Sequence, residues 1–292
     1  MTKILKKFLI LFSIIISPFL FLGCSVNNVL NEKTANFPII KEIGNYIIEI
    51  EYSKLYKNSL ITKYYITSKD GSNIERSSIF ANVKDIDNVI DYGIYPIEVL
   101  WEKIDDNKMV VVKEYLIASK NFNSINIKYD LDGTKIKNIS AEEKNISGSY
   151  HLIESNDNYK YIHNKFYLDG FNFTIESINH LDFGSIIQFY ITDTQEDKVD
   201  TLSNKILSNY YLKLKSNEYI KTYEIEHSAS LIDENLIKDL VLQNNRNNNY
   251  DIDIKYISFF QGNLIYDSNN INIDDMQVYL INKITGEETL IY

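Results

Sequence analysis

Cysteine, histidine and clustered carboxylates are the residues of this chain whose types and spacing could do chemistry. Cys24 is the only cysteine among 292 residues, and it ends a three-part segment made of a cationic head, Met1–Lys7, an apolar run, Phe8–Leu22, and the small residue Gly23. This order of charged, apolar and small-residue parts is typical of a secretory signal. A thiol at the end of such a signal is a candidate for lipidation. With Cys24 used in this way, no thiol remains for a disulfide or a thiolate metal site.

The segment Phe21-Leu22-Gly23-Cys24 resembles the lipobox of bacterial lipoproteins, which favours leucine, a small residue, glycine or alanine, and then cysteine. Phe21 and Leu22 depart from that pattern in a way that is typical of spirochaete lipoproteins. The resemblance implies cleavage before Cys24, a diacylglycerol on its thiol, and membrane attachment through palmitate-type acyl chains. The alternatives are a plain cleaved signal or an uncleaved anchor, which the short apolar run and Pro18 disfavour.

The four histidines, His151, His163, His180 and His227, stand too far apart in sequence to predict a site. His151 and His163 flank a turn at residues 156–158 and could meet across a hairpin as a pair of metal ligands. We expect ordinary half-exposed strand residues there. The glycines form no phosphate-binding loop and no nucleophile elbow. The sequence therefore predicts no catalytic residue, no cofactor and no metal.

Carboxylates gather late in the chain, with asparagines between them: Asp251, Asp253, Asp267, Asp274 and Asp275. Oxygen-rich loops can hold calcium, but this spacing matches no calcium loop, and we expect a solvated surface. A pair of such carboxylates could also serve hydrolysis.

The charge of the chain excludes some partners. The formal net charge is −10, and removal of residues 1–23, which hold three lysines and no acidic residue, makes it −13. Such an acidic body has no electrostatic footprint for nucleic acid or for anionic lipid, so the acyl chains would have to hold it to the membrane. The many isoleucines, asparagines and tyrosines match AT-rich codons, and a binding surface does not follow from them.

Period-two alternation dominates from Phe37 onward and predicts a mainly β, antiparallel sandwich. In Tyr46–Ser53, the side chains of Tyr46, Ile48, Ile50 and Tyr52 are expected on one face. Further strands are expected at 61–68, 74–83, 94–102, 109–118, 125–131, 134–139, 159–168, 171–178, 186–192, 205–215, 218–227, 250–259, 276–282 and 289–292. A helical turn is expected at Asp85–Tyr92.

One amphipathic helix is expected near residues 231–243, with Ser230 as its cap, because apolar residues from Leu231 to Val241 follow helical spacing. The asparagine-rich loop after it, Asn244–Asn249, is expected to be exposed. Asn244, Asn245, Arg246 and Asn247 are its candidate partner-binding residues, since loops on a β scaffold commonly carry recognition. Codon bias alone is the alternative explanation for this loop.

The polar stretch 140–149 predicts a boundary between two β-rich domains, 37–145 and 146–292. A signal peptide, 1–23, and a lipidated tether, 24–36, precede them. One large sandwich with a lid helix is the alternative.

These observations favour a lipid-anchored protein of the bacterial cell envelope that binds a host or envelope protein at the outer membrane surface and has no catalytic activity. In general character the chain resembles the β-rich surface lipoprotein antigens of spirochaetes. A periplasm-facing structural or envelope-assembly lipoprotein is the alternative, and an anchored carboxylate-dependent hydrolase is a weaker one. Protease treatment of intact cells separates the first two.

Overall fold

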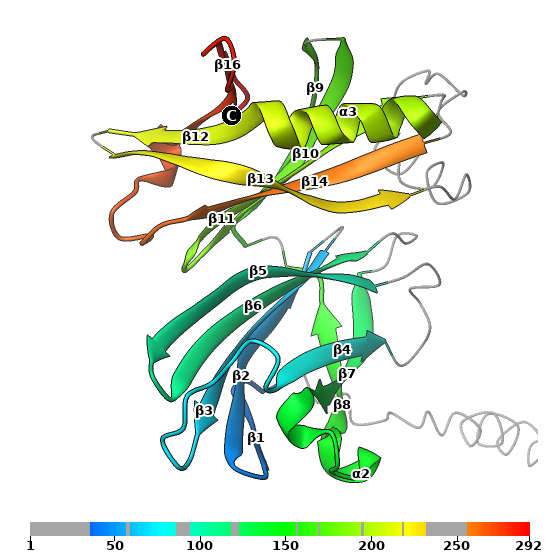
Figure 1. Cartoon of the computed structure of the whole chain (residues 1–292), viewed down its shortest axis with the longest axis vertical. Coiled ribbons are helices and arrows are strands. Elements are labelled where there is room, and N and C mark those ends of the chain that lie inside the picture. The colour runs from blue at the N-terminus through cyan, green and yellow to red at the C-terminus, as the bar shows by residue number, and fades with distance from the viewer. Residues whose placement is uncertain are drawn as a thin grey trace, which may run out of the picture. The chain divides into compact units, whose positions relative to one another are not determined.

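A computed structural model of the chain describes residues 36–56, 59–85, 94–117, 123–155, 157–168, 170–193, 196–217, 219–231 and 256–292. Strands dominate these residues, and the strands pair in antiparallel fashion within three sheets (Figure 1). The prediction of a mainly β, antiparallel fold is therefore confirmed.

The first part of the chain forms a five-stranded sheet, in the order β1-β2-β3-β6-β5, and a three-stranded sheet, in the order β4-β7-β8. The five-stranded sheet consists of β1 (Ile39–Ile43), β2 (Tyr46–Leu55), β3 (Ser59–Ser68), β6 (Lys108–Ile117) and β5 (Ile94–Asp105). The three-stranded sheet consists of β4 (Phe80–Asp85), β7 (Ser124–Asp132) and β8 (Asn145–Ile153). A turn of 3-10 helix, η1 (Thr134–Ile136), and the short helix α2 (Ala141–Lys144) lie between β7 and β8.

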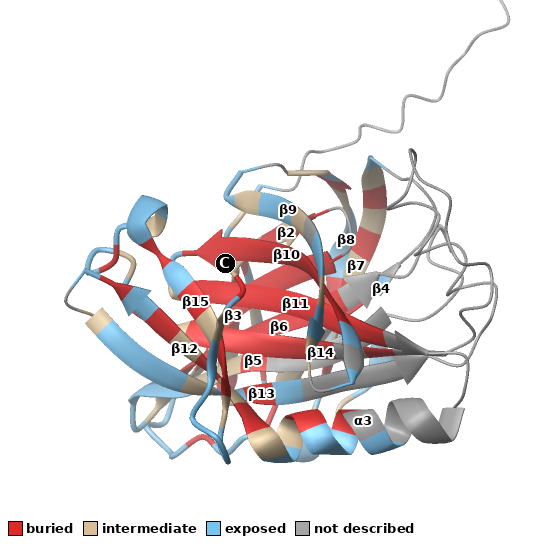
Figure 2. Ribbon diagram, turned by 90° about the horizontal axis from the view of Figure 1, so that it is seen from above, coloured by how far each residue is buried: buried red, intermediate tan, exposed pale blue. Residues whose placement is uncertain are grey.

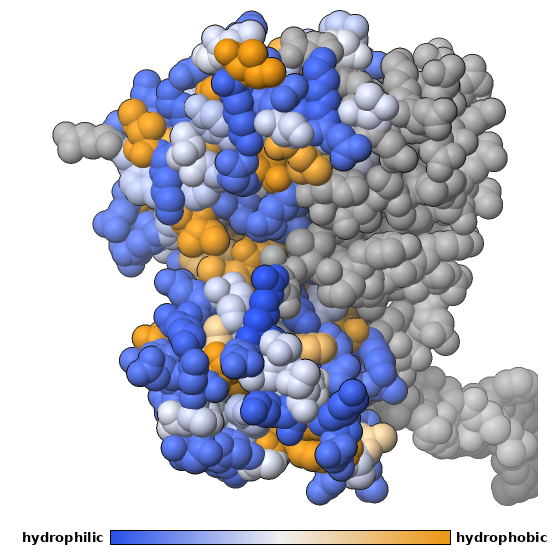
Figure 3. Space-filling model, in the orientation of Figure 1, coloured by the Kyte–Doolittle hydropathy of each residue, from blue (hydrophilic) through white to orange (hydrophobic). Residues whose placement is uncertain are grey.

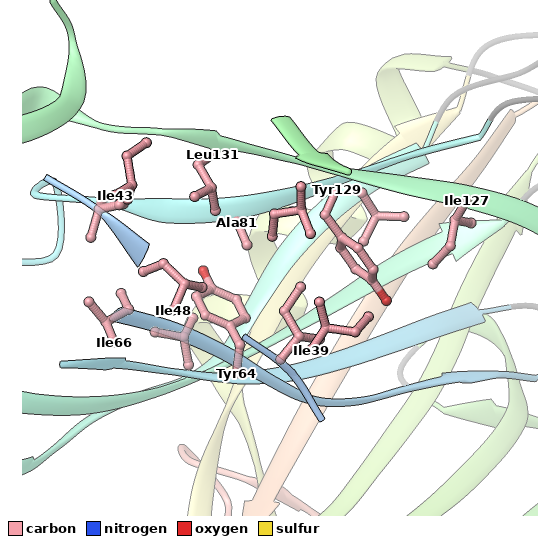
Figure 4. Packing of buried hydrophobic residues seen from close by; sticks show 14 of the residues in the cluster. Ile39, Ile43, Ile48, Tyr64, Ile66, Ala81, Ile127, Tyr129 and Leu131 are labelled. Atoms are coloured by element: carbon pink, nitrogen blue, oxygen red, sulfur yellow. The ribbon is translucent and has the colours of Figure 1, made fainter. Parts of the chain in front are cut away.

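These two sheets enclose the first hydrophobic core. Ile48 and Tyr64 of the five-stranded sheet face Tyr129 and Leu131 of β7, and all four side chains are buried (Figure 4). Alternation explains this core, because every second residue of a strand points to the same face. Two sheets with their apolar faces together form a sandwich.

A β-bulge in β2 changes which residues of that strand face the core. The register with β3 shifts between Ile50 and Tyr52. Ser53 and Leu55 are buried after the shift, whereas Tyr52 is only half-buried. The expectation that Tyr52 shares a face with Ile50 is therefore wrong, because the extra residue of a bulge reverses the alternation.

The second part of the chain forms one eight-stranded sheet in the order β16-β15-β12-β13-β14-β11-β10-β9. Its strands are β9 (Tyr159–Leu168), β10 (Phe171–Leu181), β11 (Gly184–Asp193), β12 (Tyr210–Ser216), β13 (Tyr219–Leu231), β14 (Tyr256–Ile265), β15 (Gln277–Asn282) and β16 (Glu288–Leu290). The helix α3 (Glu196–Asn209) precedes β12, and the 3-10 turn η2 (Ile273–Asp275) precedes β15. Buried residues concentrate on the neighbouring strands β10 and β11 (Figure 2).

The eight-stranded sheet curls, so that strands from its two ends share the second hydrophobic core. Phe173 of β10 and Val278 of β15 belong to the same cluster. Gly262 of β14 permits close packing inside the curve: a Cβ atom there would lie 2.0 Å from Cδ1 of Leu212 on β12. A side chain at position 262 would therefore force this part of the core to move.

The alternation pattern does not predict α3, the longest helix among the described residues. Residues 205–209 belong to it rather than to the expected strand 205–215. Ile206 is fully buried in the second core, and its burial anchors the helix to the sheet. Tertiary packing thus outweighs the weak local signal of this polar segment.

Two expected return strands are also wrong. In the range 74–83, only residues from Phe80 onward form a strand, and this strand pairs with β7 instead of β3. Thr134–Ile136 forms a 3-10 turn where a strand was expected after Asp132-Gly133. The backbone N–H groups of Thr134 and Lys135 instead donate to the carbonyls of Ser77 and Ser78, at 2.8 and 3.0 Å.

The predicted helix near 231–243 is contradicted at its start. Ser230 and Leu231 belong to β13, where they pair with Ser258 and Ile257, so Ser230 is not a helix cap. The remainder, 232–243, lies outside the described residues. Of the helical turn expected at Asp85–Tyr92, Asp85 belongs to β4, where it pairs with Ile127, and residues 86–92 lie outside the described residues.

The expected boundary stretch, 140–149, holds α2 and the beginning of β8. Ser140 caps α2 in a capping box with Glu143. β8 pairs with β7, and its Ile146 and Leu152 lie in the first core. Residues 146–153 therefore pack with the first group of strands. Residues 35–292 form one compact unit, and the division into two domains stays a prediction.

Candidate functional site

Charged and polar side chains gather where the five-stranded sheet meets the eight-stranded sheet. Lys63 of β3 is buried, and its Nζ lies 3.0 Å from Oε2 of Glu51 and contacts Asp182 of the β10–β11 turn. Tyr52 donates a hydrogen bond of 2.9 Å from its hydroxyl to Oδ1 of Asp182. The bulge in β2 creates this group, because it places Tyr52 directly opposite Lys63.

The electrostatics of this group fix Lys63 as a cation. Burial lowers the pKa of Lys63, but the carboxylates of Asp182 and Glu51 outweigh burial and hold it above its usual value. Burial alone would raise the pKa of Asp182. The hydrogen bond and the charge of Lys63 outweigh burial, so the pKa of Asp182 lies below its usual value. A permanently charged amine is no nucleophile. The group is therefore an ion pair that ties β3 to the β10–β11 turn.

Glu114 of β6 forms a second polar contact between these sheets. It is fully buried, and its Oε1 accepts a hydrogen bond from Nε2 of Gln188 on β11. Burial raises the pKa of Glu114 to about 7, and the nearby Ser59 hydroxyl and Gln188 amide offset only part of that rise. A group that titrates near neutrality can gain and lose a proton under physiological conditions.

Gln188 belongs to a row of polar residues that crosses the eight-stranded sheet. The strand register places Ser177, Gln188, Gln261 and Glu226 side by side on β10, β11, β14 and β13. Ser177, Gln188 and Gln261 are buried, and Ser177 donates a hydrogen bond of 3.1 Å to Gln188. A buried polar row is costly unless its groups are hydrogen-bonded, so this face is not an ordinary apolar core.

Several polar atoms at this contact have no hydrogen-bond partner within the part of the chain that the structure describes. They are Oε2 of Glu114, the hydroxyl of Tyr56 and both amide atoms of Asn179. The rings of Tyr56 and Tyr159 stack with centroids 5.8 Å apart. Buried groups of this kind call for a water molecule, a proton or a ligand to complete their hydrogen bonds.

His180 and Ser185 form a separate buried pair in the same sheet. Nδ1 of His180 lies 2.8 Å from Oγ of Ser185, which also contacts the hydroxyl of Tyr266. Burial, assisted by Lys160, lowers the pKa of His180 to about 4, so its ring is neutral at pH 7. Nε2 of this ring faces the Tyr292 hydroxyl at 3.4 Å rather than a carboxylate. The arrangement lacks the acid that orients the base in a serine-nucleophile triad.

The predicted site residues fall elsewhere. Cys24 and the loop residues Asn244, Asn245, Arg246 and Asn247 lie outside the described residues. His151 bonds to Oδ1 of Asn126 at 2.9 Å through Nδ1. The side chain of His163 lies outside the description, so the structure does not test the proposed pair.

The late carboxylates behave as local turn residues where they are described. Asp267 accepts hydrogen bonds from Asn269 and Asn270, and Asp275 accepts one from Asn272. Asp251 and Asp253 lie outside the description. Among the residues that the structure describes, no three histidine, cysteine, aspartate or glutamate side chains are grouped so that they could hold a metal ion. Nor does any helix in the described ranges have the length and apolarity needed to cross a membrane.

Sequence reasoning missed Lys63, Glu114 and Asp182. A signal for Glu114 was present, since Lys113-Glu114 interrupts the otherwise apolar strand Met109–Ile117. A charge inside an apolar strand indicates a buried polar contact. Its partner Gln188 could not be inferred, because that pairing depends on how two distant sheets meet.

Known proteins offer little guidance. The chain matches no protein-family model and no curated protein. It is similar to a solved structure described as the conserved domain protein from Bacillus anthracis, with 12% identity and a TM-score of 0.42. That match covers 90% of this chain and 87% of the other.

Proposed function

We propose that this chain is a lipid-anchored protein of the bacterial cell envelope, exposed at the outer membrane surface, that binds a host or envelope protein without catalytic turnover. The observation that carries the proposal is Cys24, the only cysteine, placed at the end of the cationic and apolar segments of residues 1–23. Several acyl chains on Cys24 would anchor the protein stably.

The position of the folded body supports this proposal. The first strand, β1, begins at Ile39, and the tether residues 25–36 span at most about 40 Å when extended. The β-sheets would therefore stay close to the bilayer. Exposed large apolar side chains among the described residues are spread mostly over different elements, and Figure 3 shows them scattered among polar residues. This scattered pattern does not support attachment to a membrane through a broad apolar patch.

The buried ionisable groups also favour binding over turnover. Lys63 is held as an ion pair, and His180 and Ser185 are buried in a closed hydrogen-bond chain. These groups are placed to maintain the sheets. Recognition would then depend on loops far from Cys24, and Asn244–Asn249 with Arg246 remains the proposed contact.

The anchor is tested by labelling cells with a radioactive fatty acid. Wild-type protein and a Ser25→Ala control should take up label and partition into detergent, whereas Cys24→Ala should remain unprocessed and unlabelled. Equal labelling of Cys24→Ala and wild type would refute the anchor.

The outward orientation is tested by adding protease to intact cells. Rapid loss of the protein, with a periplasmic marker left intact, is the expected result. Resistance until the outer membrane is permeabilised would favour the periplasm-facing alternative.

The role of the asparagine-rich loop is tested by deleting Asn244–Asn249. The deletion should weaken attachment of the protein to immobilised host matrix proteins and leave its thermal midpoint almost unchanged. Unaltered attachment would eliminate the loop as the contact.

A further inference from the structure

We propose that Glu114 is a proton-binding switch at the contact between the five-stranded and eight-stranded sheets. The protonated carboxyl keeps the two sheets packed, and its ionisation draws water into the contact and loosens it.

The surroundings of Glu114 suit a neutral carboxyl better than a carboxylate. Gln188 donates a hydrogen bond to its Oε1, while Oε2 has no partner in the described ranges. Lys63, a cation of β3, already pairs with Glu51 and Asp182. A buried carboxylate without a cation is strongly disfavoured.

Hydroxyl groups that could accept the proton's hydrogen bond surround the carboxyl. Ser59 lies next to Glu114, and the hydroxyls of Tyr56 and Tyr159 face it from the end of the β2 strand and from β9. The Tyr56 hydroxyl has no hydrogen-bond partner in the described part of the chain. The Ser59 hydroxyl, which already interacts with the carboxyl, is the candidate acceptor for the proton of a neutral Glu114.

Carboxylates gather around Tyr56 and Tyr159, the two tyrosines beside Glu114. Among the described residues, Asp157 and Asp182 raise the pKa of Tyr56, and Glu176 and Glu154 raise the pKa of Tyr159. On β5, the residue in register with Glu114 is the apolar Ile97. Burial raises the pKa of Glu114 to about 7, so the proton leaves within the neutral range.

The apolar part of this contact is small. Its described buried members are Tyr56, Ile61, Val99, Val112, Leu181 and Ile186. Beside them lie the polar row of Ser177, Gln188 and Gln261 and the unpartnered Asn179. Water that enters with a charged Glu114 would find hydrogen-bond partners among these polar side chains.

The test compares the full mature chain with Glu114→Gln, which has nearly the same shape and no charge. Urea unfolding is followed between pH 5 and pH 8. The folded pKa lies above the value of about 4.5 for an unperturbed glutamate, so the stabilising effect of the proton is lost as pH rises through about 7. The unfolding constant of the wild type should rise on the order of 100-fold relative to that of Glu114→Gln.

A carboxyl-to-amide change at an exposed site provides the control. Glu287→Gln, in the β15–β16 turn, should keep the full pH dependence of the wild type. His180 is present in all three proteins, so its titration does not contribute to the difference between their pH dependences. Equal pH dependence of wild type and Glu114→Gln would overturn the proposal.

Hydrogen exchange on the wild type keeps the proposal testable even if Glu114→Gln does not fold. Amides of β6 and β11 should lose protection above pH 7, after correction for intrinsic exchange, while those of β7 should not. Equal protection changes in β6, β11 and β7 would show that ionisation does not loosen this contact and would also overturn the proposal.

Discussion

Lys63 and Asp182 stand 119 residues apart in sequence, yet they form an ion pair that joins β3 to the β10–β11 turn. The Lys63 side chain is 9% exposed and that of Asp182 is 50% exposed. The pair therefore lies at the rim of the contact between two sheets, with one partner inside and one in solvent.

We expect the coupling between these two side chains to be modest, because solvent screens the half-exposed Asp182. A double-mutant cycle of Lys63→Met and Asp182→Asn should give an interaction energy of about 1 kcal/mol in urea unfolding. High salt should reduce it. A coupling near zero at low salt would show that the pair does not hold the sheets together.

His180 should make the protein sensitive to acid. Its pKa of about 4 in the folded state lies below the unfolded value of about 6.5, so the unfolded chain binds the proton first. Stability should therefore fall as pH drops from about 6.5 to about 4, by up to about 3 kcal/mol. His180→Gln should lack this fall. Matching acid profiles of variant and wild type would assign the sensitivity to other groups.

Gly262→Ala should destabilise the curled sheet, because the new Cβ would overlap Cδ1 of the fully buried Leu212. Overpacking of this kind costs about 1–3 kcal/mol. Leu212→Val removes the overlapping atom, so adding it to Gly262→Ala should recover part of the loss. Purely additive effects of the two substitutions would mean that the core accommodates the methyl group elsewhere.

Limited proteolysis should decide whether the chain has two domains. Because β8 packs with the first group of strands, a cut between domains should fall after Ile153 and not within 140–149. We expect two resistant fragments, one that ends near residues 154–158 and one that begins there, and mass spectrometry would identify them. A single resistant core would support the alternative of one large sandwich.

The strands with clear alternation were predictable from sequence, and those whose role depends on distant contacts were not. The strands expected from Tyr46 and at 159–168 are present as β2 and β9. β4 pairs with β7 and not with β3, the strand before it in sequence. The burial of Ile206 holds α3 against the sheet. The sequence pattern does not predict the β-bulge after Ile50, although this bulge places Tyr52 opposite Lys63.

The candidate site was harder to predict than the fold. Glu114 interrupts an apolar strand, which marks it as unusual, but the sequence does not say that Gln188 lies across from it. Alternation assigns residues to faces of a sheet. It does not determine which faces of two sheets meet, and that meeting creates the polar contact.

The position of β14 has a consequence for how the chain folds. β14 pairs with β11 on one side and β13 on the other, although residues 194–255 separate β11 from β14 in sequence. Until β14 is available, β11 and β13 each present a row of unpaired backbone groups to other chains. Such long-range pairing is slow, so incomplete chains that stop before Tyr256 would be the most prone to aggregate.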